Sequence, residues 1–300
     1  MTKKCLGCGA ILQDSDSKKV GYTPKLSNDL CMRCFKLKHY GENLNNSKVQ
    51  DNASIINHIN KTKATVLFLV DFLNINNEII EYFKKIKNSK YLVITKSDII
   101  PKNILKDKLV ENIKRVYSIN EDIYFSSTLS KENINKFLSL ADDTKVMLCG
   151  LTNMGKSSLI NKMIGSDITV SNKENTTQEF IKVGSFIDAP GFVSNYKVLV
   201  AASKIKPITY QLKSKYYLLI GKYFLASDKD INITLYLPNN ITVEKRRKRE
   251  EYNYNLNINN NEDLVIKGLG FIKFSSESCI FINNSEIEIR SSIVGGNHEN

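Results

Sequence analysis

The sequence has no long apolar run. A helix that spans a bilayer needs about 20 consecutive apolar residues, whereas the longest candidate here, Ala64 to Val70, has only the length of a strand. The first residues, Met1 to Cys8, also lack the apolar core of a signal peptide. We therefore expect a cytoplasmic protein without stable membrane association.

The sequence has fewer acidic than basic residues. The 300 residues include 43 lysines and arginines against 31 aspartates and glutamates, a formal net charge of +12. This excess favours a polyanionic partner, with nucleic acid as the first candidate and an anionic membrane surface as the second. A generally basic surface without a specific partner is the alternative.

Cysteines are few, and their spacing is unlike a disulfide framework. Four of the six form the pairs Cys5-x-x-Cys8 and Cys31-x-x-Cys34, which in a reducing cytoplasm favours metal binding over disulfides. Four thiolates complete the coordination of Zn²⁺, so we expect a structural site. Iron in a rubredoxin-like site and a redox dithiol are alternatives. The surrounding lysines and aromatic residues suit RNA, or are simply a solvated surface.

Composition divides the chain into three parts. Residues 1–48 form the expected zinc-binding module, and residues 49–202 alternate strand and helix patterns typical of a parallel α/β sheet. Residues 203–300 alternate apolar and polar residues, which predicts a β-rich domain for recognition of partners or RNA. In the middle part we expect strands at Thr65–Asp71, Tyr91–Thr95, Ile123–Ser126, Lys145–Cys149, Phe180–Val183 and Ser185–Asp188, and helices at Glu78–Lys87, Asn103–Tyr117 and Lys131–Ala141.

A phosphate-binding loop follows the fourth of these strands. The segment from Gly150 to Ser157 fits G-x-x-x-x-G-K-[ST] between an apolar strand and an amphipathic helix. Its backbone N–H groups and the helix dipole favour a phosphate. Lys156 is expected to reach the β- and γ-phosphates, and Ser157 to bind Mg²⁺. The other predicted nucleotide contacts of this loop are Gly150, Asn153, Met154, Gly155 and Ser158.

Two further elements belong with this loop. Asp188-Ala189-Pro190-Gly191 ends an apolar strand and matches D-x-x-G. Asp188 would hold Mg²⁺ through water, and the Gly191 N–H would contact the γ-phosphate. Thr177, with Thr176 as the alternative, lies in the polar loop before this motif and is expected to close on Mg²⁺. The predicted catalytic set is thus Lys156, Thr177, Asp188 and Gly191.

Base-reading motifs come earlier in the chain. Thr95-Lys96-Ser97-Asp98 follows a buried strand and varies the N-K-x-D pattern. A carboxylate selects guanine by accepting from N1–H and the exocyclic amine, so Asp98 would read the base while the Lys96 stem lies along its face. Ser126-Ser127 follows the next strand and fits an S-A-[KL] loop, in which Ser126 and Ser127 contact the nucleotide. A plain turn after a strand is the alternative for T-K-S-D.

The order of these motifs is inverted. The base-reading loops precede the phosphate loop, whereas ordinary GTPases place the phosphate loop first. Joining the old termini and opening the chain between the third and fourth strands gives this order with an intact sheet. The predicted fold is therefore α/β, a circularly permuted P-loop GTPase domain with an N-terminal zinc module and a C-terminal β-rich domain. We expect nucleotide-dependent movement to pass through the connector Ser203 to Pro207.

The cysteine pairs, the permuted motifs and the tail segments Lys206 to Leu212 and Asp263 to Gly270 together resemble the bacterial YqeH family. The resemblance implies a GTPase in the assembly of the small (30S) ribosomal subunit that binds ribosomal RNA or the pre-subunit in a nucleotide-dependent way. Thr95 and Ser127 depart from the usual Asn and Ala. A nucleotide-gated RNA-binding scaffold with negligible GTP turnover is the rival hypothesis.

The resemblance also bears on catalysis. Phe192 follows the D-x-x-G glycine, where Ras-like GTPases have a water-orienting glutamine, and an aromatic ring cannot hold that water. Related GTPases with an asparagine like Asn153 in the phosphate loop are thought to use K⁺. The resemblance therefore implies slow hydrolysis that K⁺ or the ribosome stimulates.

Three remaining features concern packing and surface charge. The run from Lys245 to Arg249 would contact RNA phosphates, or else form a solvated helix face with acidic neighbours. Cys149 and Cys279 both lie in apolar strands and are expected in the core.

Overall fold

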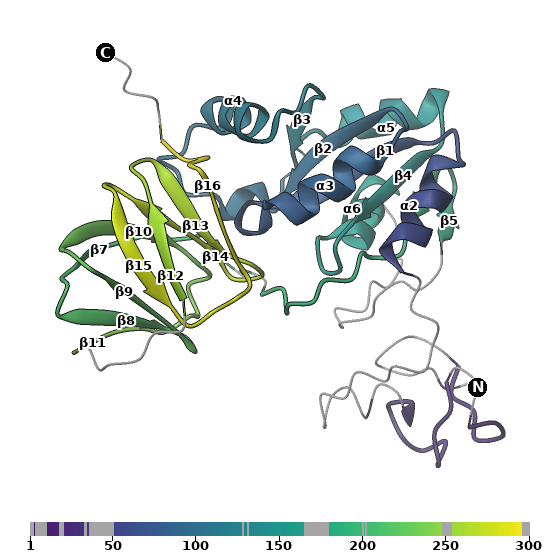
Figure 1. Cartoon of the computed structure of the whole chain (residues 1–300). Helices are drawn as coiled ribbons and strands as arrows, with labels where there is room; N and C mark the ends of the chain where they lie inside the picture. Colours follow the sequence, from purple (N-terminus) through teal and green to yellow (C-terminus); the bar gives the residue numbers. More distant parts are fainter. Residues whose placement is uncertain are drawn as a thin grey trace.

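The computed structural model describes residues 3, 11–17, 21–32, 35, 51–127, 129–130, 132–164, 180–199, 201, 203–247 and 254–295. In these residues a six-stranded sheet with helices lies beside two five-stranded antiparallel sheets (Figure 1). Within the same ranges, no helix combines the length and apolarity needed to cross a bilayer.

The six-stranded sheet has the order β3-β2-β1-β4-β6-β5, and only β5 runs antiparallel to its neighbour. Its central strand β1 is buried along its whole length, which matches an apolar run covered on both faces. The strands are β1 (Thr65–Asp71), β2 (Lys90–Thr95), β3 (Ile123–Phe125), β4 (Val146–Gly150), β5 (Ile181–Val183) and β6 (Phe186–Asp188).

Helices cover both faces of this sheet. The connections through α3 and α4 lead from β1 to β2 and on to β3, toward one edge of the sheet, whereas the connection through α5 runs back past β1 to β4. Because such connections are right-handed, the reversal of direction places α5 on the face opposite to α3 and α4. Helix α2 lies on the α3 side, where the Asn52 amide donates to the Tyr82 hydroxyl at 3.0 Å (Figure 1). The helical segments are α2 (Asn52–Asn60), η1 (Phe72–Asn74), α3 (Asn77–Lys85), η2 (Ser97–Ile99), α4 (Lys106–Tyr117), α5 (Ile134–Asp143) and α6 (Lys156–Ile164).

The predicted elements of this sheet are present, but two helices begin later than expected. Helix α4 starts at Lys106 rather than Asn103, and α5 starts at Ile134 rather than Lys131. Asn133 has φ +57°, a left-handed conformation that a right-handed helix cannot continue through. The motif order leaves the sheet intact, since β2 and β3 precede β4 in the chain and still lie in one sheet with it.

The C-terminal part is a pair of antiparallel sheets with the orders β16-β13-β14-β10-β7 and β11-β8-β9-β15-β12. Buried side chains from both sheets form one apolar cluster, so the sheets pack face to face. The strands are β7 (Ile208–Leu212), β8 (Tyr216–Ile220), β9 (Tyr223–Ser227), β10 (Ile231–Tyr236), β11 (Val243–Arg247), β12 (Tyr254–Ile258), β13 (Glu262–Ile266), β14 (Gly270–Phe274), β15 (Ser278–Ile282) and β16 (Ile287–Ser291).

One alternative and one expectation for this part are wrong. Lys245 to Arg247 lie in the exposed edge strand β11, not in a helix, and Arg246 contacts Glu244 two residues away, on the same side of the strand. Charged side chains suit an edge strand because they discourage pairing with another chain. Cys279 is half-buried rather than in the core, since β15 turns Ile280 and Ile282 inward and its odd residues outward. Cys149, by contrast, is fully buried as predicted.

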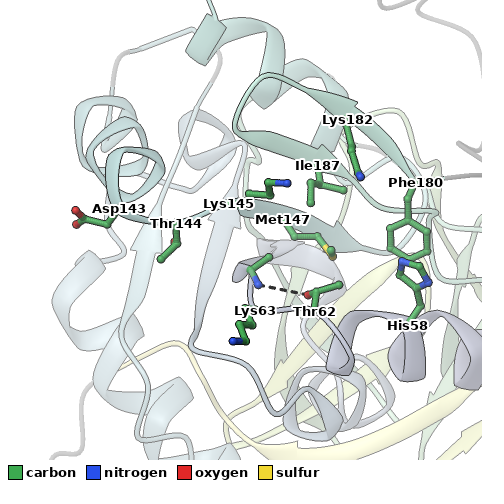
Figure 2. A pocket seen from close by; sticks show the side chains of 11 residues that line it. His58, Thr62, Lys63, Asp143, Thr144, Lys145, Met147, Phe180, Lys182 and Ile187 are labelled. Atoms are coloured by element: carbon green, nitrogen blue, oxygen red, sulfur yellow. Dashed lines mark hydrogen bonds between the residues drawn. The ribbon is translucent and has the colours of Figure 1, made fainter.

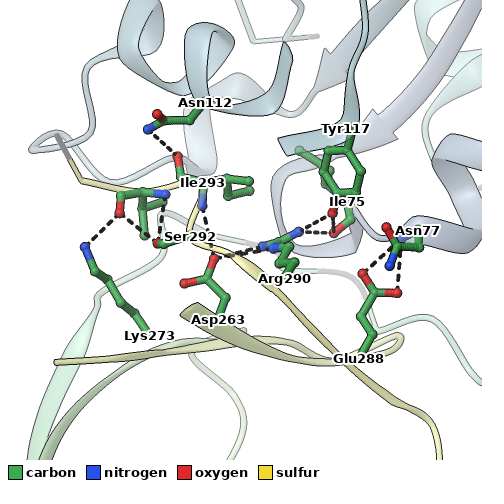
Figure 3. A network of polar contacts seen from close by, with 11 residues as sticks. Ile75, Asn77, Asn112, Tyr117, Asp263, Lys273, Glu288, Arg290, Ser292 and Ile293 are labelled. Carbon is green, nitrogen blue, oxygen red and sulfur yellow. Dashed lines mark hydrogen bonds and ion pairs between the residues drawn. The ribbon is translucent and has the colours of Figure 1, made fainter. Parts of the chain in front are cut away.

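The C-terminal sheets contact the α/β sheet through a buried polar network (Figure 3). Arg290 on β16 pairs with Asp263 at 3.3 Å and donates to the Tyr117 hydroxyl at 2.9 Å and to the carbonyl of Ile75. Phe72 of η1 packs edge-on against Phe271, with ring centroids 5.3 Å apart. The two parts therefore share a common core at this boundary.

The predicted connector, Ser203 to Pro207, also contacts both parts. Ile205 is buried, and its N–H donates to the carbonyl of Ile99 at 2.8 Å. The Asn239 amide holds the same segment from the other side through the Lys204 carbonyl at 2.7 Å and the Lys206 N–H at 3.0 Å. The connector is thus docked on the base-reading loop and on the C-terminal sheets.

Candidate nucleotide-binding site

The phosphate loop joins β4 to α6 through residues in unusual backbone conformations. Gly150, Asn153 and Gly155 have φ of +142°, +64° and +83°. A Cβ on Gly150 would lie 2.2 Å from the Leu69 carbonyl oxygen, so only glycine fits beside β1. A Cβ on Gly155 would meet nothing within 4 Å, which leaves the loop open for close approach of a phosphate.

Lys156 is folded over this loop. Its side chain is buried, and Nζ donates to the carbonyls of Leu151 at 2.8 Å and Gly150 at 3.2 Å. Burial lowers the pKa of Lys156, while the nearby Asp188 and Cys149 oppose the shift. A desolvated ammonium that contacts only neutral carbonyls would gain strongly from an anionic ligand.

The D-x-x-G segment meets the phosphate loop at two points. The Ser157 hydroxyl lies 2.6 Å from Asp188 Oδ2. Hydroxyl and carboxylate oxygens are the ligand types that Mg²⁺ accepts, so this pair fits the metal of a bound nucleotide. Gly191 lies against Thr152, whose Cγ2 would be 2.6 Å from a Cβ at that position. Asp188 and Gly191 therefore converge on the same loop as Lys156.

Phe192 lies in the core. It is fully buried and stacks against Tyr82 and Phe68, with ring centroids 5.1 and 5.8 Å apart. Its N–H donates to the Gly150 carbonyl at 3.0 Å. The position after the D-x-x-G glycine thus packs the segment against β1 and α3.

The two base-reading loops are bonded to one another. The Ser97 N–H donates to the Ser126 carbonyl at 3.0 Å, and the Ser127 hydroxyl donates to Asp98 Oδ1. A carboxylate accepts about four hydrogen bonds, so this contact orients Asp98 and leaves it acceptor capacity for a base. The serine that stands in place of alanine at position 127 therefore supports the carboxylate.

Lys96 connects the base-reading loop to the phosphate loop. It adopts φ +52°, and its Nζ lies 3.3 Å from the Asn153 carbonyl and 3.2 Å from Asp71 Oδ2. Asp71 was not anticipated from the sequence, although an acidic residue that ends a buried strand is a usable signal. Its other oxygen accepts from the Asn74 N–H at 3.1 Å and so caps η1. Thr95 is buried, with its hydroxyl 3.4 Å from the Val70 carbonyl.

The remaining predicted residues are placed as follows. The side chain of Met154 is buried, and that of Ser158 is half-buried at the start of α6. Thr177 and three of the predicted zinc ligands, Cys5, Cys8 and Cys34, lie outside the described residues, whereas Cys31 is buried beside Leu12. Among the described residues no cluster of three or more potential ligands suits a metal ion.

Comparison with known proteins identifies relatives of this arrangement. A family model described as RsgA GTPase matches residues 50–199, half of the 300-residue chain, and one described as 50S ribosome-binding GTPase matches residues 145–266. YqeH of Bacillus subtilis is 28% identical over 285 residues, which cover 81% of this chain and 77% of that protein. The predicted resemblance to the YqeH family is thus confirmed.

More distant relatives cover shorter segments. The small ribosomal subunit biogenesis GTPase RsgA of Clostridium botulinum is 26% identical over 45% of this chain and 50% of its own length. NO-associated protein 1 of Arabidopsis thaliana is 26% identical over 53% of this chain and 34% of its own length. Among solved structures, YjeQ of Thermotoga maritima is 20% identical over 43% of this chain and 48% of its own, with a TM-score of 0.33. Because the RsgA GTPase model matches half of the chain, this protein belongs to the RsgA GTPase family.

Proposed function

We propose that this protein is a GTP-binding and GTP-hydrolysing switch in assembly of the small ribosomal subunit. The observation that carries the proposal is the convergence of Ser157, Asp188 and Lys156 on one loop, with Asp98 held by the neighbouring base-reading loop. The name of the RsgA relative adds the small subunit as the partner. The cycle would be docking in the GTP state and release after hydrolysis.

In this proposal each residue of the site has a stated role. Gly150, Asn153, Met154, Gly155 and Ser158 line the phosphates, and Lys156 exchanges its carbonyl contacts for the β- and γ-phosphates. Ser157 binds Mg²⁺, with Asp188 and Thr177 completing the metal surroundings, and Gly191 contacts the γ-phosphate. Asp98 accepts from guanine, whereas Lys96, Thr95, Ser126 and Ser127 shape the base pocket. Asn153 is the candidate contact of a potassium ion.

The proposed organisation keeps the predicted boundaries. Residues 1–48 form a module in which Cys5, Cys8, Cys31 and Cys34 hold Zn²⁺, since four thiolates satisfy this ion. Residues 49–202 form the GTPase domain, and residues 203–300 recognise ribosomal RNA or the pre-subunit. The excess of basic residues over the whole chain supports a nucleic-acid partner, and cytoplasmic localisation follows from that role.

Co-sedimentation with purified ribosomal subunits tests the proposal. The full chain is mixed with small or large subunits at physiological salt, with either a non-hydrolysable GTP analogue or GDP. We expect selective binding to small subunits with the analogue, and weaker binding with GDP. Preference for large subunits, which the second family description names, would contradict the assignment of the partner.

A scaffold with negligible turnover is the second candidate, and Phe192 favours it. A buried aromatic ring at this position supplies no group that orients the attacking water. Single-turnover hydrolysis with and without small subunits separates the candidates. Hydrolysis that subunits or K⁺ accelerate supports the switch, whereas the same slow rate under all conditions supports the scaffold.

A further inference from the structure

A groove on the α/β sheet lies away from the nucleotide site. It has a volume of about 500 Å³ and is lined by the end of α2, the starts of β1 and β4, and the edge strand β5 (Figure 2). Lys145 precedes β4, whereas the phosphate loop follows it, so the two sites are separated by the length of that strand, roughly 17 Å. None of the predicted nucleotide-binding residues lines the groove.

The floor of the groove is apolar and its rim is basic. Met147 and Ile187 are buried beneath it, and Lys63, Lys145 and Lys182 line it with exposed side chains. In the described part of the chain none of these lysines forms an ion pair, although Asp143 also lines the groove. The three lysines and the one acid of the lining, Asp143, thus leave the groove with a net positive charge.

An aromatic pair closes one end. The rings of His58 and Phe180 stack with centroids 4.0 Å apart and an interplanar angle of 26° (Figure 2). His58 is exposed and Phe180 is half-buried, so the stack ends in an accessible aromatic surface. Aromatic side chains next to basic ones are the usual platform for unpaired bases, because every base has a face that stacks.

The spacing of the three lysines favours a ligand with several phosphates over one with a single phosphate. Lys63 precedes β1, Lys145 precedes the adjacent β4, and Lys182 lies on β5. The outermost of these strands, β1 and β5, are three strand spacings apart, roughly 14 Å. A single phosphate cannot meet charges spread over this width, whereas a chain with a phosphate at each nucleotide can. Lysine ammonium groups act as point charges and do not read base edges, so no sequence preference is expected.

We propose that this groove binds single-stranded RNA, with one base stacked on the His58–Phe180 pair and the backbone phosphates along Lys63, Lys145 and Lys182. The proposal extends the proposed function by locating one RNA contact on the GTPase sheet. It places this contact on the α2 face of the sheet, apart from the nucleotide site and strand β11. A partner protein with an acidic segment is the competing occupant.

Salt-dependent binding of a 12-nucleotide fluorescein-labelled oligouridylate to the full chain tests the proposal. The groove variant carries Lys63→Ala, Lys145→Ala and Lys182→Ala. The matched control carries Lys102→Ala, Lys108→Ala and Lys162→Ala, which removes the same charge from exposed positions before α4, on α4 and on α6. Loss of three phosphate contacts lowers the slope of log K against log salt by about 2. We expect this change, with an affinity loss of tenfold or more, in the groove variant only.

A second variant tests stacking. Phe180→Ala should weaken binding by about fivefold or more and leave the salt slope unchanged, because it removes a base platform but no charge. With 4-thiouridine in the oligonucleotide, crosslinks should map to the peptide that contains His58 or Phe180. Equal effects of the two triple variants, or crosslinks confined to other regions, would overturn the proposal. Binding of an acidic peptide in the groove without binding of the oligonucleotide would also overturn it.

An experiment that rejects RNA binding in the groove can be told apart from one that rejects the proposed function. The groove variant should bind GDP as tightly as the wild type and melt at the same temperature, because its substitutions are exposed and lie away from the phosphate loop. A wild-type chain that hydrolyses GTP and binds small subunits, with an unaltered salt slope in the groove variant, would reject the groove alone. A chain without nucleotide-dependent subunit binding but with the predicted slope change would reject only the switch.

Discussion

Two buried basic residues of this protein have opposite surroundings. Arg290, at the boundary with the C-terminal sheets, pairs with the carboxylate of Asp263 and donates to a hydroxyl and a carbonyl (Figure 3). Lys156, in the phosphate loop, contacts two carbonyls and forms no ion pair with a described residue. A buried charge whose partners all come from the protein stabilises the fold, whereas one without an anionic partner is available for a ligand.

The backbone conformation also differs between the nucleotide site and the boundary with the C-terminal sheets. Lys96 and Asn153 both adopt left-handed conformations and contact each other at the nucleotide site. At the boundary, β13 and β16 pair in regular antiparallel register around Asp263 and Arg290. Residues in sparsely populated conformations can bring backbone groups close to a ligand, whereas the central pair of this interface uses regular strands.

The substitution Arg290→Met should have the largest effect on stability. It leaves the Asp263 carboxylate buried without its cation, so the free energy of unfolding should fall by about 3–5 kcal/mol. Urea denaturation measures the loss. Replacing both partners, as Arg290→Met with Asp263→Leu, should recover much of it, and the exposed Arg246→Ala should leave the midpoint unchanged. A small loss for Arg290→Met alone would contradict the structural role of this pair.

Lys156→Ala should have the complementary effect. Removal of the ammonium should weaken GDP binding by about 2–5 kcal/mol, because a nucleotide phosphate loses its buried charged partner. Stability without nucleotide should fall less than in Arg290→Met, since Lys156 interacts electrostatically with the nearby Asp188 but forms no ion pair with a described residue. Fluorescence titration with a labelled GDP and urea denaturation give the two values, with Lys162→Ala on the same helix as the control. A large loss of stability with unchanged GDP affinity would show that Lys156, like Arg290, stabilises the fold and does not bind the nucleotide.

Asp98→Asn sharpens the description of the base-reading loop. The amide cannot accept from both guanine N–H groups, so GDP affinity should fall by about 1.5–3 kcal/mol. Xanthosine diphosphate, which offers a carbonyl in place of the exocyclic amine, should bind relatively better. Competition between the two nucleotides measures the ratio, and Asp107→Asn on α4 serves as the control. An unchanged ratio would show that another group selects the base.

The smallest expected effect concerns the connector. Replacing Ser203 to Pro207 with a flexible linker of equal length should remove the coupling between nucleotide state and subunit binding, about 1–3 kcal/mol. The coupling is the ratio of subunit affinities with the GTP analogue and with GDP. A second variant that retains Ile205 controls for loss of its burial and of its contact with Ile99. Coupling that persists in both variants would assign transmission to the Arg290 boundary instead.

Much of the α/β sheet could be predicted from the sequence because its signals are local. The run Thr65–Asp71 is apolar throughout and forms β1 with the predicted ends. The glycines and Lys156 of the phosphate loop occur at fixed spacing, so the motif predicts the loop that the structure contains. For β11 the helical alternative was wrong, because the charge spacing that suits a helix face also suits an exposed edge strand.

The sequence by itself determined the motif order, the strands that carry the motifs and the residues placed on the phosphate and base-reading loops. Tertiary structure alone decided which distant residues meet. Asp71 contacts Lys96 because β1 and β2 are neighbouring strands. Lys63, Lys145 and Lys182 share a groove because β1, β4 and β5 lie in the same half of the sheet. Arg290 reaches Ile75 only after the C-terminal sheets pack on η1. Propensity and spacing act over a few residues, whereas strand order and packing depend on the burial of apolar surface from the whole chain.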